Sequence, residues 1–550
     1  MKTLKYSVWA IMLLAATLVS CTDKMDWDID PTLDRCFSAT SLSVDPTDTE
    51  AKVTFDAGMM KTNGAEKFEI QVTTATLADD EAWDNSNEVL TFETENSPYT
   101  ITDLIGDTEY SLRMRALSSQ KTASHWVHYA SSTKTTFKTK AEQIMNAVAN
   151  ADRGEDFITV SWDASKAVTK LTVSEGKEEE GQEPRTIELD DEAKAAGRYT
   201  ITGLTPSTNY TITIYYNDTK RGSVNASTAA AMPAGDEKVE LDPSITTINN
   251  DVIAKIVTAA QEKTGKTNVA ITIGLQPGQT YTMVSTAEDG TVANVKIPEG
   301  ASVTFFGLAG ESKPVLNWEK CLDISGSHAY IRFQNVSMKD NGGQYLINQD
   351  KDASVGEIAF TDCTFSDFEN SFFRIKDGVV SVDKILVDNC VMTNMAHANK
   401  APVFYIDAAT ANVGKLELKN STFDTTSHNF IHLKKAAISG GITISDCTFY
   451  NNVAGTKYFM DSNNFSTDLT ITRTILGKSM DATAKGVRTT GSIVISESLR
   501  TKDCVYGSND IKQFAAGSQT SEEIFTDPAN HNFTMKIDDR IGDPRWYKAE

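Results

Sequence analysis

Six side chains in the C-terminal half have the chemistry to bind an anion together. They lie on or just after three short apolar segments, 371–374, 402–405 and 429–432. If the third residue of each segment points inward, the fourth residue and the one two positions later point outward. The six residues are Arg374, Lys376, Tyr405, Asp407, His432 and Lys434. Arg and Lys pair with carboxylates, Arg at two points, and Tyr405 offers a ring face to sugar C–H groups. This set predicts binding of an acidic plant polysaccharide such as pectin.

These side chains can meet only if their segments stack in register. Aligning five segments predicts two outward columns on one sheet, each with one residue per segment. The first column is Ile347, Arg374, Tyr405, His432 and Met460, and the second is Gln349, Lys376, Asp407, Lys434 and Ser462. Neighbouring strands would lie about 4.8 Å apart, so the columns would form a ladder along a linear chain.

A repeated eight-residue phrase predicts the stacking. Seven copies begin at residues 331, 358, 385, 416, 442, 469 and 493. Positions one and three are apolar, and the next inward positions are six and eight, so one extra residue interrupts the alternation. Position five, where a bend must absorb it, is Asn335, Asp362, Asn389, Asn420 and Asp446 in the first five copies. Asn and Asp tolerate the left-handed conformation that such a bend needs.

A strand, an Asx bend and a second strand at this period resemble one coil of the right-handed parallel β-helix of the pectate lyases. Stacked repeats of this kind bury a core only against their neighbours. Position six holds Cys363, Cys390 and Cys447, with Val336, Ser421 and Thr474 in other copies. These residues predict an inward stack of small side chains.

The resemblance to pectate lyases also implies a catalytic alternative. Lyases of this family use Arg or Lys as the base and acidic ligands for calcium, and here Arg374 or Lys434 would be the base. Asp407 stands nearly alone as an acid, so no calcium-ligand set can be matched. We therefore expect no metal or cofactor, with calcium only under the lyase alternative. An enzyme is the less favoured interpretation.

The segment before the repeats predicts how the β-helix begins. Residues 249–262 have a helical pattern, with Val252, Ile256, Val257 and Ala260 on one face, and directly precede an apolar strand phrase. A helix there would cap the open end of the solenoid. We expect the β-helix over residues 237–515 and a C-terminal cap over residues 516–550.

Two earlier regions resemble fibronectin type III domains. Residues 35–140 contain evenly spaced short strands, and Leu104 lies six residues before Tyr110, as at the corner before the sixth strand of that family. Residues 142–231 carry Gly203-Leu204-Thr205-Pro206 followed by Tyr210, and Trp162 stands at the family's core tryptophan position. Trp83 and Trp126 could stack on sugars, although packing is the favoured role for both.

The N-terminus resembles a bacterial lipoprotein signal peptide. Lys2 and Lys5 precede an apolar run, and Leu18-Val19-Ser20-Cys21 follows it. The resemblance implies a signal peptide over residues 1–20, lipid attachment at Cys21 and a polar tether over residues 21–34. The acidic residues just after Cys21 are similar to the surface-export signal of Bacteroidetes lipoproteins.

The whole arrangement resembles Bacteroidetes surface lipoproteins of polysaccharide-utilisation systems, whose C-terminal halves are domains of unknown function. The resemblance implies an outer-membrane protein, lipid-anchored and facing the cell exterior, that binds a polysaccharide and works near a glycan transporter complex. A purely structural or docking role in that complex is a further alternative. With 75 acidic and 52 basic residues, the net charge is −23, which disfavours nucleic acid as a partner.

Overall fold

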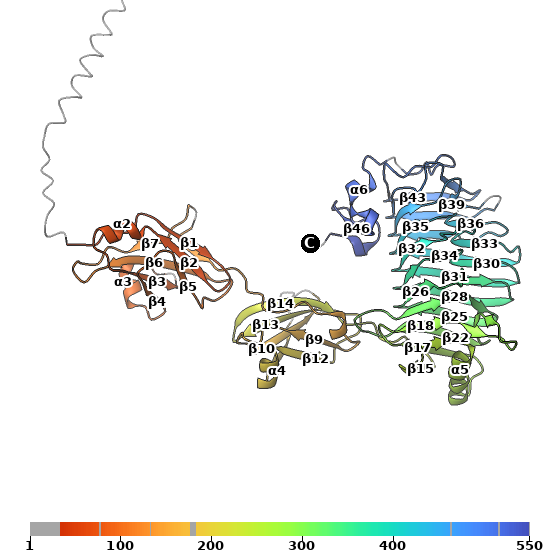
Figure 1. Ribbon diagram of the computed structural model, residues 1–550, viewed down its shortest axis with the longest axis horizontal. Helices are drawn as coiled ribbons and strands as arrows, with labels where there is room; N and C mark the ends of the chain where they lie inside the picture. Colours follow the sequence, from red (N-terminus) through yellow and green to blue (C-terminus); the bar gives the residue numbers. More distant parts are fainter. Residues whose placement is uncertain are drawn as a thin grey trace, which may run out of the picture. The chain divides into compact units, whose positions relative to one another are not determined.

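The computed structural model describes residues 34–75, 77, 79–132, 134–176, 183–462, 465–514 and 517–548. The predicted signal peptide, Cys21 and nearly all of the tether lie outside these residues. The described chain is almost entirely β, with two sandwich-type domains followed by a parallel β-helix (Figure 1). This confirms the predicted fold class. Within the described residues, no helix is long and apolar enough to cross a membrane.

The first domain is an antiparallel β-sandwich. One sheet has the order β1 (Leu42–Pro46), β2 (Ala51–Phe55) and β5 (Tyr99–Ile101). The other has the order β4 (Leu90–Thr94), β3 (Lys67–Thr73), β6 (Glu109–Leu117) and β7 (Val127–His128), and β8 (Phe137–Lys138) also pairs with β6. The core between the sheets includes the fully buried Val53, Phe68 and Met114. The Tyr110 hydroxyl accepts a hydrogen bond from Ile105 N at 2.8 Å, which is the tyrosine corner expected of such sandwiches.

The second domain contains a four-stranded and a two-stranded sheet. The larger has the order β11 (Arg185–Glu188), β10 (Lys170–Glu175), β13 (Asn209–Tyr216) and β14 (Thr219–Ser227), and the smaller pairs β12 (Arg198–Thr202) with β9 (Phe157–Ser161). Trp162 and Tyr210 are both buried, as their predicted core positions require. Short helices that the alternating pattern did not predict join strands in both domains: α2 (Ala57–Thr62), α3 (Asp80–Asn85), η1 (Asn150–Asp152) and α4 (Asp191–Ala196).

Three parallel sheets run along the β-helix. The first has the order β15 (Glu237–Glu240), β17 (Val269–Leu275), β22 (Ala301–Gly307), β25 (Gly326–Gln334), β28 (Ala353–Thr361), β31 (Val380–Asp388), β34 (Ala411–Lys419), β37 (Ile442–Ser445), β40 (Leu469–Thr472) and β43 (Ile493–Ser496). The second has the order β16 (Thr247–Ile248), β18 (Thr280–Met283), β23 (Val315–Trp318), β26 (Ser337–Asp340), β29 (Thr364–Ser366), β32 (Val391–Met395), β35 (Thr422–Thr426), β38 (Thr448–Asn452), β41 (Ile475–Leu476) and β44 (Leu499–Arg500). The third has the order β21 (Val295–Ile297), β24 (Leu322–Ile324), β27 (Ile347–Gln349), β30 (Phe373–Ile375), β33 (Phe404–Ile406), β36 (Ile431–Leu433), β39 (Tyr458–Asp461) and β42 (Lys485–Arg488).

The bend between the first and second sheets has the predicted conformation. Asn335, Asp362, Asn389, Asn420 and Asp446 all have φ between 50° and 56°. The next two copies place Arg473 and Glu497 in the same left-handed region, at φ 42° and 48°. Asn420 Nδ2 also donates to Asp388 Oδ1 at 2.8 Å, so the amide side chain ties one bend to the coil before it. The stacked bends therefore set the register of the solenoid.

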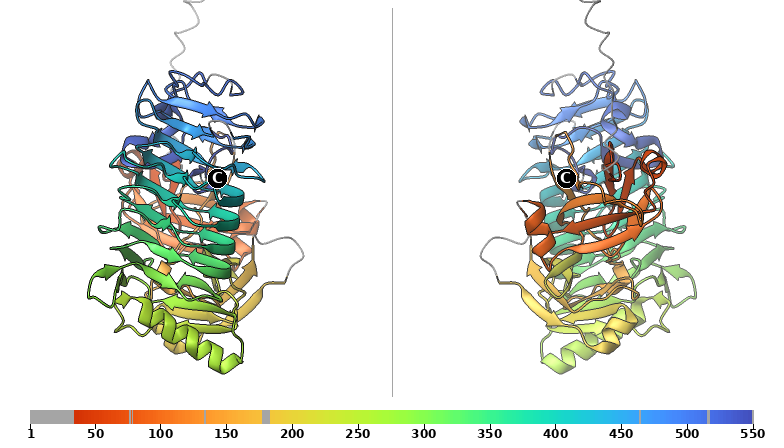
Figure 2. Two further views of the ribbon diagram at one scale, coloured as in Figure 1. Left: turned by 90° about the vertical axis from the view of Figure 1, so that its right-hand side faces the viewer. Right: turned by 90° about the vertical axis from the view of Figure 1, so that its left-hand side faces the viewer.

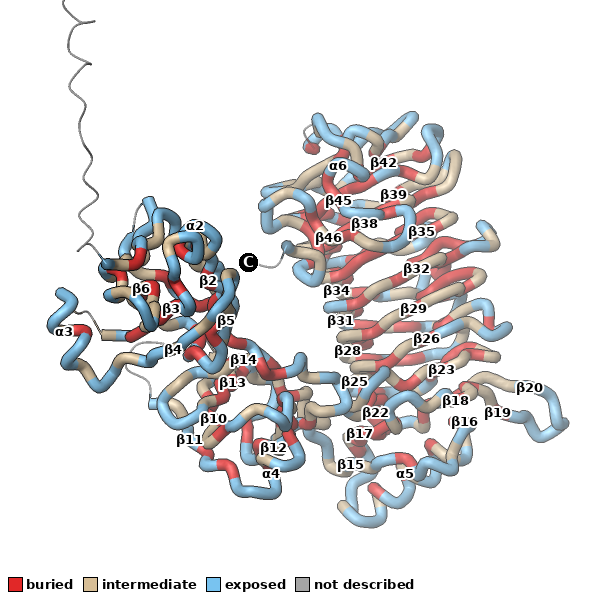
Figure 3. Tube along the Cα trace, turned by 60° about the vertical axis from the view of Figure 1, so that its left-hand side comes forward, coloured by how far each residue is buried: buried red, intermediate tan, exposed pale blue. Residues whose placement is uncertain are grey.

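The interior of the β-helix is a stack of apolar side chains. Figure 3 shows the buried positions in red along the coils. Cys363, Cys390 and Cys447 are fully buried, as the inward stack predicted. Phenylalanines also align from coil to coil: the rings of Phe305, Phe333 and Phe360 lie nearly parallel, with centroids 5.0 and 5.5 Å apart. Each coil thus buries its apolar positions against the next coil.

The predicted capping helix is α5 (Asn250–Thr264), which lies across the first coils of the solenoid (Figure 2). Asn249 caps it by accepting a hydrogen bond from Val252 N at 3.0 Å, and Gly265 ends it in the left-handed conformation with φ 69°. Ile253, Val257 and Ala260 are buried against the solenoid core. A short hairpin of β19 (Ser285–Thr286) and β20 (Val292–Ala293) follows β18.

The C-terminal segment lies along the outside of the second sheet. It contains α6 (Ser521–Ile524), β45 (Phe525–Asp527), η2 (Pro528–Asn530), β46 (Asn532–Met535) and η3 (Pro544–Trp546). Its apolar residues pack on Tyr450 and Ile475. Figure 3 shows β46 beside β38 of the second sheet. Trp546 Nε1 donates to Thr422 Oγ1 at 2.7 Å, and Arg545 Nη2 donates to Asn389 Oδ1 at 2.7 Å. The segment therefore ties together coils that are far from it in sequence.

Candidate functional site

The outward positions of the third sheet form one continuous column. Its strands β30, β33 and β36 are three residues long, with the first and third residues inward and the middle residue outward. Strand pairing aligns Arg374 with Tyr405, Tyr405 with His432, His432 with Asp461, and Asp461 with Arg488. The three central members of the predicted column therefore do lie side by side.

The predicted column was wrong at both ends. Ile347 pairs with Phe373, and Met460 pairs with Ile431, so both point into the core. The outward neighbours are Asn348 and Asp461. In the first case, the Asp340 carboxylate accepts hydrogen bonds from Gly342 N and Gln344 N, and this turn takes up one more residue than the next coil uses. Loop length between sheets thus shifted the register.

The second predicted column holds together around Asp407, which lies just after β33. Arg374 Nη2 is 2.6 Å from Asp407 Oδ2, and Lys434 Nζ is 3.0 Å from Asp407 Oδ1. Lys435, which the sequence analysis missed, places its Nζ 3.8 Å from the same oxygen. Three cations therefore share one carboxylate, which leaves two net positive charges (3 − 1 = 2). The Asp407 side chain is 10% exposed, whereas those of Lys434 and Lys435 are 48% and 50% exposed.

The charges around Asp407 alter its acidity. Burial alone would raise the Asp407 pKa, but hydrogen bonds and attraction from Arg374 and Lys434 outweigh burial and hold the pKa below its ordinary value of 3.8. Hydrogen bonds to Tyr405 and Asp407 raise the Lys434 pKa. Lys434 therefore stays protonated at neutral pH and offers a fixed positive charge to a ligand.

The Tyr405 ring packs against the cations of this cluster. The prediction that its ring face is open was wrong. The residue is only 9% exposed. The His432 ring lies parallel to it at 5.3 Å, and Arg374 Cζ and Lys434 Nζ lie 5.1 and 5.7 Å from the ring centre. Tyr405 thus holds cations by cation–π attraction rather than offering its face to a sugar.

Lys376 belongs to a neighbouring ion pair. Its Nζ lies 3.2 Å from Asp350 Oδ2, and Lys351 Nζ lies 3.3 Å from Asp350 Oδ1. Gln349, expected beside Lys376 in the second column, is instead buried inside the coil, where it bonds the Ile324 backbone. Lys376 thus belongs to a cluster separate from the one around Asp407.

His432, Asp461 and Arg488 continue the column. Arg488 binds Asp461 at two points, with Nε at 2.8 Å and Nη2 at 2.7 Å. Burial lowers the His432 pKa, and the positive charges of Lys434 and Arg488 lower it further, against the opposing effect of Asp461. The nearby His428 has a pKa lowered to about 4, mainly by burial. Both imidazoles are therefore neutral at neutral pH. We call Arg374, Lys376, Tyr405, Asp407, His432, Lys434, Lys435, Asp461 and Arg488 the third-sheet face.

The lyase alternative finds little support on this face. A base must give up its proton before it can abstract another, and Lys434 has a raised pKa. Arg374 is held by Asp407. Within the described residues, no group of three or more His, Cys, Asp or Glu is placed to hold a metal ion.

One family model matches the end of the chain. Residues 442–546 match a family model described as a domain of unknown function, DUF5123. That span holds β37 to β44 and the C-terminal segment as far as Trp546, and so includes Asp461 and Arg488 but not Asp407. No curated protein matches the chain.

Two solved structures are similar to part of the chain. A two-domain fibronectin type III segment of chicken tenascin is 16% identical, with a TM-score of 0.23, over 34% of this chain and 98% of that one. The FN1–FN3 domains of chicken CNTN1 are 11% identical, with a TM-score of 0.15, over 35% of this chain and 64% of that one. At these scores the likeness carries no argument about the fold. The fold of the first sandwich is defined by its own strand order.

Trp83 and Trp126 in the first sandwich pack against arginines. Trp83 is 3% exposed. The fully buried Arg113 places its Cζ 4.9 Å from the Trp83 ring centre and 3.9 Å from that of Trp126. Arg115 also lies over Trp126, at 4.2 Å. These contacts support a packing role for both tryptophans.

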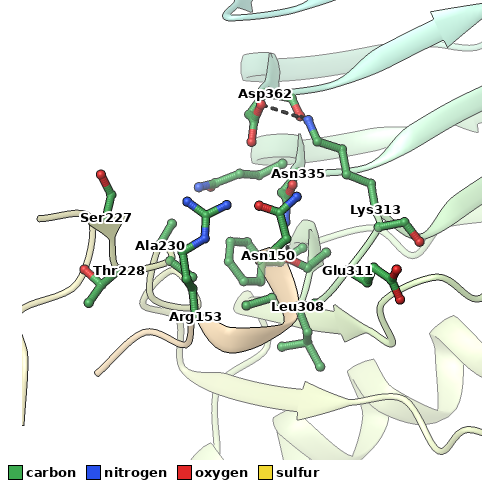
Figure 4. Close-up of a pocket in the computed structure, with 17 residues that line it drawn as sticks. Asn150, Arg153, Ser227, Thr228, Ala230, Leu308, Glu311, Lys313, Asn335 and Asp362 are labelled. Carbon is green, nitrogen blue, oxygen red and sulfur yellow. Dashed lines mark hydrogen bonds and ion pairs between the residues drawn. The ribbon is translucent and has the colours of Figure 1, made fainter. Parts of the chain in front are cut away.

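Lys313, outside the third-sheet face, is paired with an acid of the bend ladder. Lys313, in the loop after β22, donates to Asp362 Oδ1 at 2.8 Å across the ladder of Asx bends (Figure 4). It also donates to the Asp362 backbone oxygen. Lys313 therefore links a loop to a bend. The pair consists of one cation and one carboxylate, so its two charges balance.

Proposed function

We propose that this protein binds an acidic polysaccharide on the third-sheet face of its β-helix. The observation that carries the proposal is the sharing of Asp407 by Arg374, Lys434 and Lys435. The chain has a net charge of −23, so a local surplus of positive charge is unusual in it. A ligand carboxylate between the two exposed lysines would explain this surplus. Charge-assisted hydrogen bonds of this kind contribute about 1.5–3 kcal/mol each.

The proposal includes a location and a partner. Cys21 would carry a lipid that anchors the chain in the outer membrane, with the two sandwich domains as spacers and the β-helix facing the cell exterior. A glycan transporter complex would take up what the β-helix holds. These statements rest on the residue pattern 18–21 and on the order of the domains.

Affinity electrophoresis of the purified full chain tests the proposal. We expect polygalacturonate in the gel to retard the protein, and the same polymer with its carboxylates methyl-esterified to leave its mobility unchanged. Esterification keeps the sugar backbone and removes the charge, so it is the matched ligand control. Equal mobility in both gels and in a gel without polymer would refute binding of a polyuronate.

A further inference from the structure

A second tyrosine on the third sheet is flanked by two cations. Tyr458, in β39, has Arg488 Cζ 4.7 Å and Lys485 Nζ 4.9 Å from its ring centre. Lys485 is its direct partner on the next strand, β42. The arrangement matches Tyr405, whose ring lies near Arg374 Cζ at 5.1 Å and Lys434 Nζ at 5.7 Å. Each tyrosine thus has one arginine and one lysine beside it.

The two units also share the way in which the arginine is held. Arg374 pairs with the buried Asp407, and Arg488 pairs with the buried Asp461. Both guanidinium groups are thereby fixed, while a lysine lies beside each ring. Lys434 lies next to Asp407, but among the described residues no carboxylate lies within ion-pair distance of Lys485 Nζ. The positive charge of Lys485 is therefore available to a ligand.

The spacing of the units fits one extended ligand. Tyr405 lies in β33 and Tyr458 in β39, with only β36 between them. Two coils correspond to about 10 Å along the solenoid axis, from about 4.8 Å per strand. Tyr458 lies three residues before Asp461, which is in register with Tyr405, so the two units are also offset by about 10 Å along the strand direction. His432, neutral and 22% exposed on its side chain, lies on the intervening strand. The intervening strand therefore presents a neutral ring beside the paired Asp461 and Arg488, and a cationic unit lies at each end.

We propose that Tyr458, Lys485 and Arg488 form a second anion subsite, and that one linear polyuronate spans it and the Lys434–Lys435 subsite. This inference rests on the proposed function and adds the path of the ligand, which runs obliquely across the coils from the lysines that follow β36 to Lys485 in β42. Lys485 binds one carboxylate, and the lysines beside Asp407 bind another. Because the second contact is intramolecular once the first has formed, the two subsites together bind more tightly than either alone.

Calorimetric titration with galacturonate oligomers of two to eight units tests this path. We expect the affinity of the full chain to rise steeply once an oligomer is long enough to span both subsites. In Lys485→Ala, affinity for the longest oligomers should fall about tenfold, whereas affinity for the dimer, which binds at the Lys434–Lys435 subsite, should stay within about twofold. Tyr458→Phe, which keeps the ring, should leave Lys485 in place and cost less than Lys485→Ala.

Lys415→Ala is the matched control, because it removes one lysine from the first sheet, where Lys415 pairs with Glu417 at 2.5 Å. An unchanged affinity of Lys485→Ala for every oligomer would overturn the second subsite and leave the proposed function intact. An equal loss in Lys415→Ala would also overturn it, since the effect would then follow net charge alone. If the unaltered chain bound no oligomer and no polymer, both proposals would fall together.

Discussion

At the scale of single residues, Asp407 organises the third-sheet face. Its carboxylate is 10% exposed and receives Arg374 and Lys434 at 2.6 and 3.0 Å, and both cations also lie near the Tyr405 ring. The acid therefore holds the cations in place without neutralising all of them. A ligand carboxylate meets side chains that are already oriented, which limits the conformational entropy lost on binding.

Replacing Asp407 should separate stability from binding. Asp407→Asn leaves Arg374 without its charged partner, so we expect the free energy of unfolding of the β-helix to fall by about 1–3 kcal/mol. Affinity for polygalacturonate should rise or stay level, because the removal of one repelling negative charge offsets the loss of orientation of Arg374 and Lys434. Urea unfolding and calorimetry measure the two effects. The exposed Asp383, changed to Asn, controls for loss of a surface acid.

The same pair gives a defined pH dependence. The Asp407 pKa in the folded chain lies below its ordinary value of 3.8, so its pairing stabilises the fold fully above about that pH. The contribution is lost as pH falls from there through the lowered pKa, because the carboxyl then protonates. Asp407→Asn should accordingly destabilise the fold at pH 7 and have a smaller effect at pH 2. An equal loss at both pH values would contradict the ion-pair account.

At the scale of elements, the bends were predictable and the third-sheet register was only partly so. Asn and Asp at position five were enough to predict the left-handed conformation of the bends, because these residue types tolerate it. The register of β27 and β39 depends instead on loops of irregular length, in which Gln344, Val453 and Thr456 also have positive φ. Val and Thr do not favour that conformation, so it could not be predicted from the residue types at these positions. For this reason the predicted column contains Met460 where the structure has Asp461. Arg488 lies on a strand that was not among the five aligned segments.

The bend ladder can be tested at Asn420, which has φ 50° and donates to Asp388. Asn420→Ala loses that hydrogen bond and puts a Cβ without polar compensation in the left-handed region. We expect the free energy of unfolding to fall by about 1–2 kcal/mol. Asn420→Gly, which adopts positive φ without strain, should recover part of the loss. Urea unfolding followed by circular dichroism measures both variants, and an equal or greater loss in Asn420→Gly would count against the conformational explanation.

At the scale of the whole molecule, the C-terminal segment connects distant parts of the solenoid. Trp546 donates to Thr422, 124 residues earlier, and packs edge-on against Phe533 with ring centres 5.6 Å apart. Asp543, 1% exposed on its side chain, accepts from Thr422 Oγ1 and from Arg545 Nε, both at 2.7 Å. The segment lies on the second sheet and leaves the third-sheet face to a ligand.

Trp546→Ala should therefore loosen the segment and leave ligand binding unchanged. We expect a loss of about 2 kcal/mol in the free energy of unfolding and faster proteolysis after residue 516, because part of a large apolar side chain and one hydrogen bond are removed. Lys548→Ala, at an exposed position nearby, should change stability by less than about 0.5 kcal/mol. Unchanged proteolysis in Trp546→Ala would contradict the role given to this contact.

The central claim is that surplus positive charge around Asp407 binds a polyuronate, and one calorimetric comparison tests it most directly. The double variant Lys434→Ala/Lys435→Ala removes two lysines from the third-sheet face, and Lys384→Ala/Lys415→Ala removes two from the first sheet. Both change the net charge equally. We predict that affinity for polygalacturonate falls at least tenfold in the first double variant and less than threefold in the second. Equal affinities in the two double variants would contradict the account.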